Sequence, residues 1–119
     1  MRDAVIVSTA RTAIGKAYRG GFNATSGATL GSYALKAAVA RAGIEGGEID
    51  DVLWGSALQQ GTQGGNLARQ VGLRAGLPVS VSGMTMDRQC SSGLMSIATA
   101  AKQIIVDNVD IMAAGGQES

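Results

Sequence analysis

Short continuous apolar runs alternate along the chain with longer segments that are rich in alanine and leucine. Apolar runs of roughly four to eight residues are typical of strands covered on both faces of a parallel sheet, and longer apolar segments that stop at glycine are typical of helices. The runs predict strands at residues 4–7, 52–58, 79–86 and 110–114. The longer segments predict helices at residues 30–42, 66–75 and from just after position 90 to about position 106.

The predicted order is a regular alternation that begins and ends with a strand. Alternation of this kind implies an α/β fold with a mainly parallel sheet and right-handed crossovers. A chain of 119 residues can form one domain, and a domain of that size buries about two-thirds of its unfolded surface. In such a sheet, functional residues collect at the carboxyl ends of the strands.

Charge and composition argue against several classes of function. Ten basic and nine acidic residues are scattered along the chain and give a net charge of +1, so we expect no nucleic-acid partner and no anionic-membrane partner. Aromatic residues make up 3% of the chain, which also disfavours base stacking. No segment has the length of a bilayer-spanning helix or the pattern of a signal peptide, so we expect a soluble, cytoplasmic protein.

The chain contains no histidine and one cysteine, Cys90. The commonest zinc sites need histidines or a cysteine cluster, so we expect no bound metal. Neither Gly15 nor the loop at residues 61–65 has the spacing of a phosphate-binding or dinucleotide-binding loop, so no cofactor-binding residue is assigned. The adjacent Asp50 and Asp51 are interpreted as a solvated turn.

Cys90 stands where the third predicted strand meets the third predicted helix. A thiol attacks as its thiolate, and the unpaired N–H groups and aligned peptide dipoles at a helix start favour an anion by about 0.3–1 kcal/mol. Arg88 is placed to add to this effect. Ser91, Ser92 and Gly93 follow and are small, which leaves room for a substrate to approach the sulfur. This context makes Cys90 the candidate nucleophile.

Two observations oppose an active thiol. A lone cysteine is most often a small buried hydrophobic residue without chemistry. Asp87 also places a carboxylate near the sulfur, where like-charge repulsion disfavours the thiolate, unless that carboxylate turns onto backbone N–H groups as a cap. If Cys90 is a nucleophile, its base must come from outside these residues, because cysteine–histidine pairs need an imidazole.

The helix predicted after Cys90 is apolar over most of its circumference. Between positions 94 and 106 only Lys102 and Gln103 are large polar residues. A helix of this kind is normally buried on more than one side, whereas a unit of four strands and three helices covers one side well and the other poorly. We therefore expect more protein to pack over it.

Several sequence elements together resemble the amino-terminal part of a thiolase. They are Arg-Thr-Ala-Ile-Gly-Lys at residues 11–16, Asn-Leu-Ala-Arg-Gln at 66–70, Asp-Arg-Gln-Cys-Ser-Ser-Gly-Leu at 87–94 and Ala-Gly-Gly-Gln-Glu-Ser at 114–119. The resemblance covers essentially the whole chain. It implies part of the amino-terminal domain of a layered αβαβα fold, in which the carboxy-terminal half packs over the nucleophile helix.

The same resemblance implies the chemistry of the site. Thiolases transfer acyl groups between coenzyme A thioesters through an acyl-cysteine, so Cys90 would be the catalytic residue, acyl-CoA and CoA the substrates, and no cofactor would be bound. The family also uses the backbone N–H of the nucleophilic cysteine as an oxyanion donor. Its activating histidine and second cysteine lie in the carboxy-terminal half. Asp87 departs from the Asn, Ser or Thr that is more common there.

The resemblance also sets what we expect of the isolated chain. Residues 1–119 would form a partial amino-terminal domain without the carboxy-terminal half, and the full-length protein would be a homo-oligomer. Such a chain should be inactive alone because it lacks the base. The alternative is a non-catalytic α/β fragment or assembly module that offers its apolar helix to another chain.

Overall fold

A computed structural model describes all 119 residues and confirms the α/β class. Three parallel strands form one sheet in the order β2-β1-β3, with Leu53 of β1 opposite Met84 of β2 and Ala114 of β3. The elements in chain order are α1 Gly27–Ala42, η1 Gly46–Glu48, β1 Asp51–Gly55, η2 Gly61–Gln63, α2 Leu67–Arg74, β2 Ser82–Met86, α3 Ser92–Val106 and β3 Met112–Gly116.

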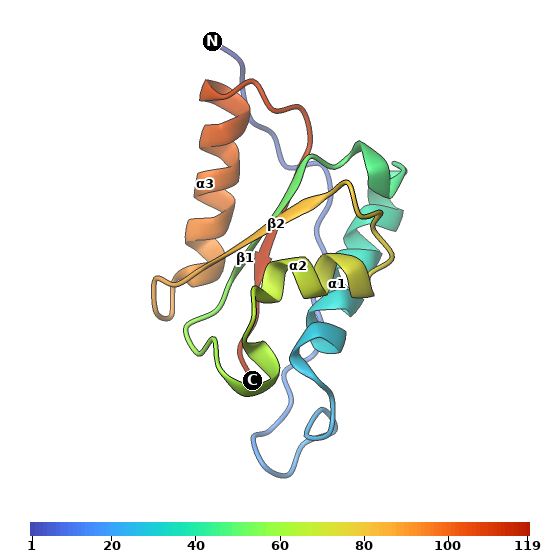
Figure 1. Cartoon of the computed structure of the whole chain (residues 1–119), viewed down its shortest axis with the longest axis vertical. Helices are drawn as coiled ribbons and strands as arrows, with labels where there is room; N and C mark the ends of the chain where they lie inside the picture. Colours follow the sequence, from blue (N-terminus) through green and yellow to red (C-terminus); the bar gives the residue numbers. More distant parts are fainter.

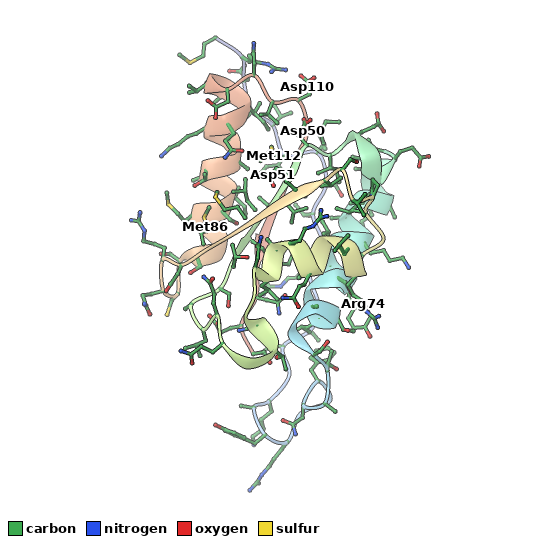
Figure 2. All side chains as sticks on the ribbon, viewed as in Figure 1. Asp50, Asp51, Arg74, Met86, Asp110 and Met112 are labelled. Carbon is green, nitrogen blue, oxygen red and sulfur yellow. The ribbon has the colours of Figure 1, made fainter.

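The sheet separates two helical layers. The α3 helix packs on β1 and β3 on one face, whereas α1 and α2 pack together on the other (Figure 1). Asp51 and Met112 begin β1 and β3 side by side, while Met86 ends β2 at the opposite, carboxyl end of the sheet (Figure 2). The carboxyl ends of all three strands therefore meet at one edge, as a parallel sheet requires.

The main core lies between the sheet and the α1/α2 layer. Trp54 and Val52 of β1 point into it, and α2 contributes residues that are completely buried. The cluster comprises Leu35, Ile49, Val52, Trp54, Leu67, Ala68, Val71, Leu77 and Val81. On the opposite face α3 buries Ser96 and Ala100, but Leu94 is 71% exposed and Val106 is 76% exposed. The expectation that α3 is covered on one side only is confirmed for this chain.

The three predicted helices are confirmed, with small differences at their ends. The α1 helix begins at Gly27, three residues earlier than predicted, because Ser26 caps it by accepting a hydrogen bond from the Thr29 N–H. It ends at Ala42, as predicted, and is followed by the C-cap Gly43, whose φ of 69° is left-handed and suits glycine. Gly76, just beyond α2, has a φ of 91°.

The strand predicted at residues 4–7 is wrong. Val5, Ile6 and Val7 are 72 to 78% exposed, and no helix or strand forms before Gly27. No backbone-to-backbone hydrogen bond involves residues 1–15. A strand exists only where a neighbouring backbone pairs with it, and an apolar run does not supply that neighbour.

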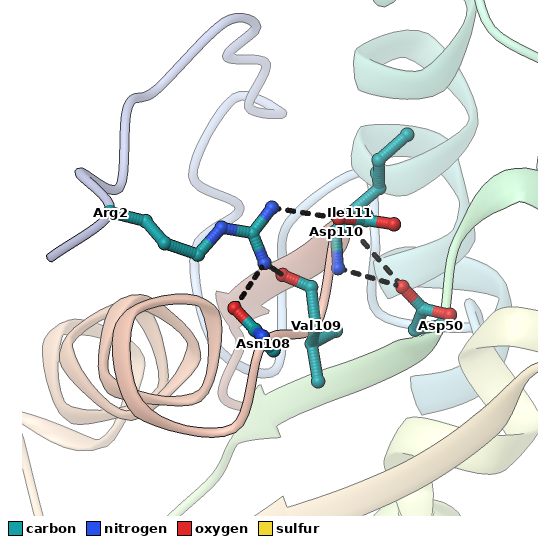
Figure 3. Close-up of polar contacts among 6 residues, drawn as sticks. All are labelled: Arg2, Asp50, Asn108, Val109, Asp110 and Ile111. Carbon is teal, nitrogen blue, oxygen red and sulfur yellow. Dashed lines mark hydrogen bonds and ion pairs between the residues drawn. The ribbon is translucent and has the colours of Figure 1, made fainter.

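Side chains hold the amino-terminal segment instead. Arg2 donates to Asn108 Oδ1 at 3.2 Å and to the Val109 carbonyl at 3.3 Å, and it forms an ion pair with Asp110 Oδ1 at 2.7 Å (Figure 3). Ser8 donates its hydroxyl to the Ala38 carbonyl at 2.7 Å. The segment is therefore attached to the turn before β3 and to α1 without entering the sheet.

Three strands are shorter or shifted relative to the sequence prediction. β2 begins at Ser82 because the Arg69 guanidinium donates to the Val79 and Val81 carbonyls and holds them in a turn. β3 begins at Met112 because the N–H groups of the two preceding residues donate to Asp50 Oδ2, each at 3.2 Å (Figure 3). Asp50 is exposed, as its interpretation in a solvated turn predicts, but its carboxylate also connects the approach to β1 with the start of β3. Asp51, the other residue of that predicted turn, is instead the first residue of β1.

β1 ends at Gly55, three residues earlier than predicted. Beyond it the Ser56 N–H still donates to the Met86 carbonyl at 3.0 Å. The Ala57 and Leu58 N–H groups then leave the sheet and donate to the Glu118 carboxylate, each at 3.0 Å. A side chain from the end of the chain therefore terminates this strand.

Candidate functional site

Cys90 lies in the loop between β2 and α3, at the carboxyl end of the sheet. Its residue is exposed, so the interpretation of Cys90 as a buried hydrophobic residue is wrong for this chain. Ser91 is the N-cap of α3 and Ser92 its first helical residue, which places Cys90 directly before the helix start. The thiol therefore stands at the helix start, as the sequence predicts, but the next two N–H groups, of Ser91 and Ser92, already donate to the Arg88 and Gln89 carbonyls at 3.1 Å.

The Ser92 hydroxyl closes the loop around Cys90. Ser92 is 4% exposed. Its Oγ accepts from the Arg88 N–H at 2.8 Å and donates to the Gln89 carbonyl at 2.6 Å. Gln89 has a φ of 49°, an uncommon conformation for a residue with a side chain. One buried hydroxyl therefore fixes both residues that precede Cys90.

The side chain of Asp87 makes a hydrogen bond within the loop, whereas the side chain of Arg88 makes none. Asp87 Oδ1 accepts from the Gln89 N–H at 2.7 Å, so the carboxylate turns onto the backbone of the loop, although it does not cap α3 itself. Arg88 is exposed, and its guanidinium makes no hydrogen bond or ion pair. The expected contribution of Arg88 to the thiol stays a prediction.

Glycines bring the start of α3 into direct contact with two strand ends. A Cβ on Gly55, the last residue of β1, would overlap the carbonyl group of Ser92 and lie 2.6 Å from Gly93 N. A Cβ on Gly116, the last residue of β3, would lie 2.8 Å from the Cα of Gly93. The Cys90 loop is therefore seated on the sheet through backbone contacts, which leave little freedom for it to shift.

A hollow of about 410 Å³ opens beside Cys90. Its lining comes from the loop, from the start of α3 and from the carboxyl ends of β1 and β3, and comprises Gly55, Gln89, Cys90, Ser92, Gly93, Gly116, Gln117 and Glu118. The hollow and Cys90 thus lie at the carboxyl ends of the strands, which is where functional residues collect in parallel sheets; a functional role for them stays a prediction. A second hollow of about 350 Å³ lies at β2, between Asn66 and Thr85, and does not include the thiol.

Glu118 is the charged group in the lining of the Cys90 hollow. Its Oε1 accepts from Ser56 Oγ and from the Leu58 N–H at 3.0 Å, and from Gln63 Nε2 at 3.1 Å. Its Oε2 accepts from the Ala57 N–H at 3.0 Å. Partial burial raises the pKa of Glu118. The four hydrogen bonds, led by the one from Ala57, lower the pKa by a larger amount, so that it lies below its ordinary value of 4.5.

Gln117 and Gln63 complete the polar network below the hollow. Gln117 Oε1 accepts from Trp54 Nε1 at 3.0 Å, and its Nε2 donates to the Gly27 carbonyl at 2.8 Å and to Gln63 Oε1 at 3.0 Å. Gln63 is 1% exposed, and no buried side-chain polar atom lacks a partner. The two amides thus join β1, β3, η2 and α1.

Sequence reasoning identified Cys90 but missed Ser92 and Glu118 as parts of its site. The sequence indicates only that Ser92 is small, because it does not show that the Ser92 hydroxyl is buried. Glu118 belongs to the Ala-Gly-Gly-Gln-Glu-Ser element at 114–119, which is a signal for the family and not for the site.

No group of three or more histidine, cysteine, aspartate or glutamate side chains is arranged to hold a metal ion. None of the helices has the length and apolar character needed to cross a bilayer.

Comparison with known proteins agrees with the resemblance. Residues 4–119 match the family described as "Thiolase, N-terminal domain". A 3-ketoacyl-CoA thiolase of Bacillus subtilis is 46% identical over 119 residues, 100% of this chain and 30% of the relative. An acetyl-CoA acetyltransferase of Cupriavidus necator is 42% identical over 119 residues, again 100% of this chain and 30% of the relative.

A third relative extends the comparison to another organism. An acetyl-CoA acetyltransferase of Rhizobium meliloti is 43% identical over 115 residues, which cover 97% of this chain and 29% of the relative. The chain thus spans about 30% of the length of the curated relatives it matches. The match over residues 4–119, together with the parallel α/β architecture, shows that the chain belongs to the thiolase family.

Proposed function

We propose that this chain supplies the nucleophile of a thiolase-type acyltransferase and that Cys90 is that nucleophile. The observation that carries the proposal is the exposed thiol, the only one in the chain, at the start of α3 and beside a hollow at the carboxyl end of the sheet. The names of the relatives, 3-ketoacyl-CoA thiolase and acetyl-CoA acetyltransferase, indicate acyl-CoA and CoA as the substrate class.

In the degradative direction the Cys90 thiolate attacks the 3-keto carbon of a 3-ketoacyl-CoA. The bond between C2 and C3 then breaks, its electron pair stays on C2, and C2 takes a proton to give acetyl-CoA. The shortened acyl group remains on Cys90 as a thioester. A CoA thiolate attacks that carbonyl carbon, the sulfur of Cys90 leaves, and a shortened acyl-CoA is released. In the synthetic direction the Cys90 thiolate attacks the carbonyl carbon of one acetyl-CoA and CoA leaves. C2 of a second acetyl-CoA loses a proton and attacks the acetyl carbonyl carbon on Cys90, and the sulfur of Cys90 leaves to give acetoacetyl-CoA.

The backbone at Cys90 suits an acyl-transfer site. The Cys90 N–H donates no hydrogen bond within the chain. It is therefore available to the carbonyl oxygen on which negative charge develops during attack, in the manner of an oxyanion hole. Loss of one such donor typically costs about 3–4 kcal/mol of transition-state stabilisation.

An imidazole base must come from outside these residues, because the chain has no histidine. Removing a general base usually costs about 10²–10⁴-fold in rate. We therefore expect no measurable thiolysis of acetoacetyl-CoA by the chain alone. Robust turnover by the purified 119-residue chain would contradict this expectation.

The decisive test replaces the matching residues of the Bacillus subtilis relative with this chain. The chimaera, incubated with acetyl-CoA, should gain the mass of one acetyl group on the peptide that contains Cys90, and it should cleave acetoacetyl-CoA. Cys90→Ala should lose both, whereas Ser91→Ala, a change of similar size at an exposed neighbour, should retain both. A Cys90→Ala chimaera that still turns over would refute the role of Cys90.

A second candidate is a non-catalytic assembly module. The observation that favours it is the apolar outer side of α3, where Leu94, Ile97 and Val106 are 71%, 40% and 76% exposed. In that case Cys90 would be alkylated by iodoacetamide no faster than a free cysteine, even in the chimaera. An enhanced alkylation rate in the assembled protein favours the acyltransferase.

A further inference from the structure

We infer that Glu118 is a positioning residue for the Cys90 site, because its carboxylate holds the segment after β1 against the segment after β3 and so fixes the seat of the Cys90 loop. The inference rests on the proposed function only for its catalytic readout. Its structural part concerns this chain alone.

The carboxylate of Glu118 joins two segments that are far apart in sequence. Its four donors all lie between Ser56 and Gln63, and the hydrogen-bonded pairs are 55 to 62 residues apart in the chain. One backbone bond reinforces the junction, from the Gln117 N–H to the Gly55 carbonyl at 3.0 Å. Glu118 is therefore a clamp between the ends of β1 and β3.

The clamp lies directly below the residues that seat the Cys90 loop. Gly55 immediately precedes the clamped segment after β1, and Gly116 lies two residues before Glu118. These two glycines are the ones that contact the Ser92 carbonyl and the Gly93 backbone. If β1 and β3 move apart at this end, the first turn of α3 loses its support. The N–H groups that favour an anion next to Cys90 then lose their fixed position.

The chemistry of the donors requires a carboxylate. An ionised carboxylate accepts hydrogen bonds at both oxygens, whereas a glutamine at position 118 would accept at one oxygen only. With Oε1 kept on its three donors, the glutamine NH₂ group would face the Ala57 N–H, which is itself a donor. The pKa of Glu118, which lies below the ordinary value, agrees with an ionised group at neutral pH.

The test compares alkylation rates of Cys90, the only thiol, in the folded 119-residue chain. We expect Glu118→Ala and Glu118→Gln to slow alkylation by iodoacetamide several-fold at neutral pH, and Glu118→Asp to recover part of the rate. Asp3→Asn removes one negative charge from an exposed side chain with no hydrogen bond, and it should leave the rate unchanged. Circular dichroism checks that each variant remains folded.

The direction of the effect separates positioning from charge. Removing a nearby negative charge would by itself favour the thiolate and accelerate alkylation, so a faster reaction in Glu118→Gln overturns the inference. Equal rates in the folded Glu118 variants overturn it as well. If Glu118→Ala or Glu118→Gln does not fold, Glu118→Asp carries the test. Hydrogen exchange at the Ser92 and Gly93 amides must then be faster in Glu118→Asp than in the parent chain, and unchanged exchange at these amides refutes the clamp.

The catalytic readout uses the chimaera described above. Glu118→Gln should lower kcat several-fold with KM nearly unchanged, because the loop is displaced while the substrate-binding contacts of the rest of the protein persist. If Glu118→Gln leaves kcat unchanged while the Cys90→Ala chimaera is inactive, the role of Glu118 is refuted and the proposed function is not. An active Cys90→Ala chimaera refutes the proposed function and leaves the clamp to be judged by the alkylation rates.

Discussion

Residues 1–16 and the loop that carries Cys90 are both free of regular helix and strand, yet they are held in opposite ways. The amino-terminal segment is anchored by a few side-chain contacts, made near Arg2 and near Ser8 and Thr9, and its apolar run stays exposed. The Cys90 loop is fixed by a buried hydroxyl, by backbone contacts with two strand ends and by a carboxylate clamp beneath it. Irregular backbone becomes rigid through satisfied polar groups and close packing, and apolar residues alone do not achieve this.

The largest effect should come from filling the contact between β1 and α3. Gly55→Ala would place a methyl group on the Ser92 carbonyl, and overpacking of this kind costs about 1–3 kcal/mol, with the upper end expected because the neighbours are backbone atoms. Urea unfolding measures the loss.

The matched control lies in the neighbouring contact, between α3 and β3. A Cβ on Gly93 would lie 3.6 Å from the Gly116 Cα, an ordinary distance. Gly93→Ala also removes a glycine from a helix and should be neutral or stabilising by up to about 1 kcal/mol. If Gly55→Ala is as stable as Gly93→Ala, the contact between Gly55 and Ser92 is looser than described.

A smaller loss should follow from removing the hydroxyl that closes the loop. Ser92→Ala leaves the Arg88 N–H without its acceptor in a part-buried position, which costs about 1–3 kcal/mol. Ser91→Ala removes only an exposed hydrogen bond to the Arg88 carbonyl and should cost less than about 1 kcal/mol. If the two variants unfold at the same urea concentration, Ser92 does not hold the loop.

Acid should weaken the site more than it weakens the amino-terminal segment. Because the pKa of Glu118 is lowered in the folded chain, its contribution to stability is complete above the ordinary value of 4.5 and is lost as pH falls through the lower folded value. The free energy of unfolding should therefore fall more steeply below pH 4.5 in the parent chain than in Glu118→Gln. Identical pH profiles for these two proteins would contradict the bonding assigned to Glu118.

The smallest effect is expected at the amino terminus. Arg2 and Asp110 are 39% and 79% exposed, and ion pairs of this kind contribute about 0.2–1 kcal/mol. Arg2→Ala should lower the free energy of unfolding by no more than that, and Arg19→Ala, an exposed arginine without an ion pair, should leave it unchanged. A loss larger than that of Ser92→Ala would reverse the comparison between the two regions.

The sequence predicts the parts of this fold that depend on local pattern. Helices α1, α2 and α3 follow from apolar periodicity and from their stop signals, and the position of Cys90 at the junction of β2 and α3 follows from the order of the elements. The strand at residues 4–7 fails because pairing depends on a neighbour that is not encoded in the run itself.

The sequence cannot supply the long-range polar contacts that set the strand ends and the site. β1 stops at Gly55 because of Glu118, and β3 starts at Met112 because of Asp50, partners that lie about 60 positions away along the chain. In the sequence Ser92 cannot be distinguished from an exposed serine. Its role in holding the loop comes from the burial of its hydroxyl. The thiol was therefore predictable, whereas the groups that hold it were not.

The contact of Gly55 and Gly116 with the start of α3 also limits how this site can change by mutation. Most overpacked positions can be relieved when a neighbouring side chain becomes smaller. Here the obstructing atoms are the carbonyl group of Ser92 and the backbone of Gly93, which no substitution can shorten. A search for second-site suppressors of Gly55→Ala should therefore return revertants at position 55 and no compensating substitution at a neighbouring residue. Position 55 should then accept no residue other than glycine through stepwise mutation of its surroundings.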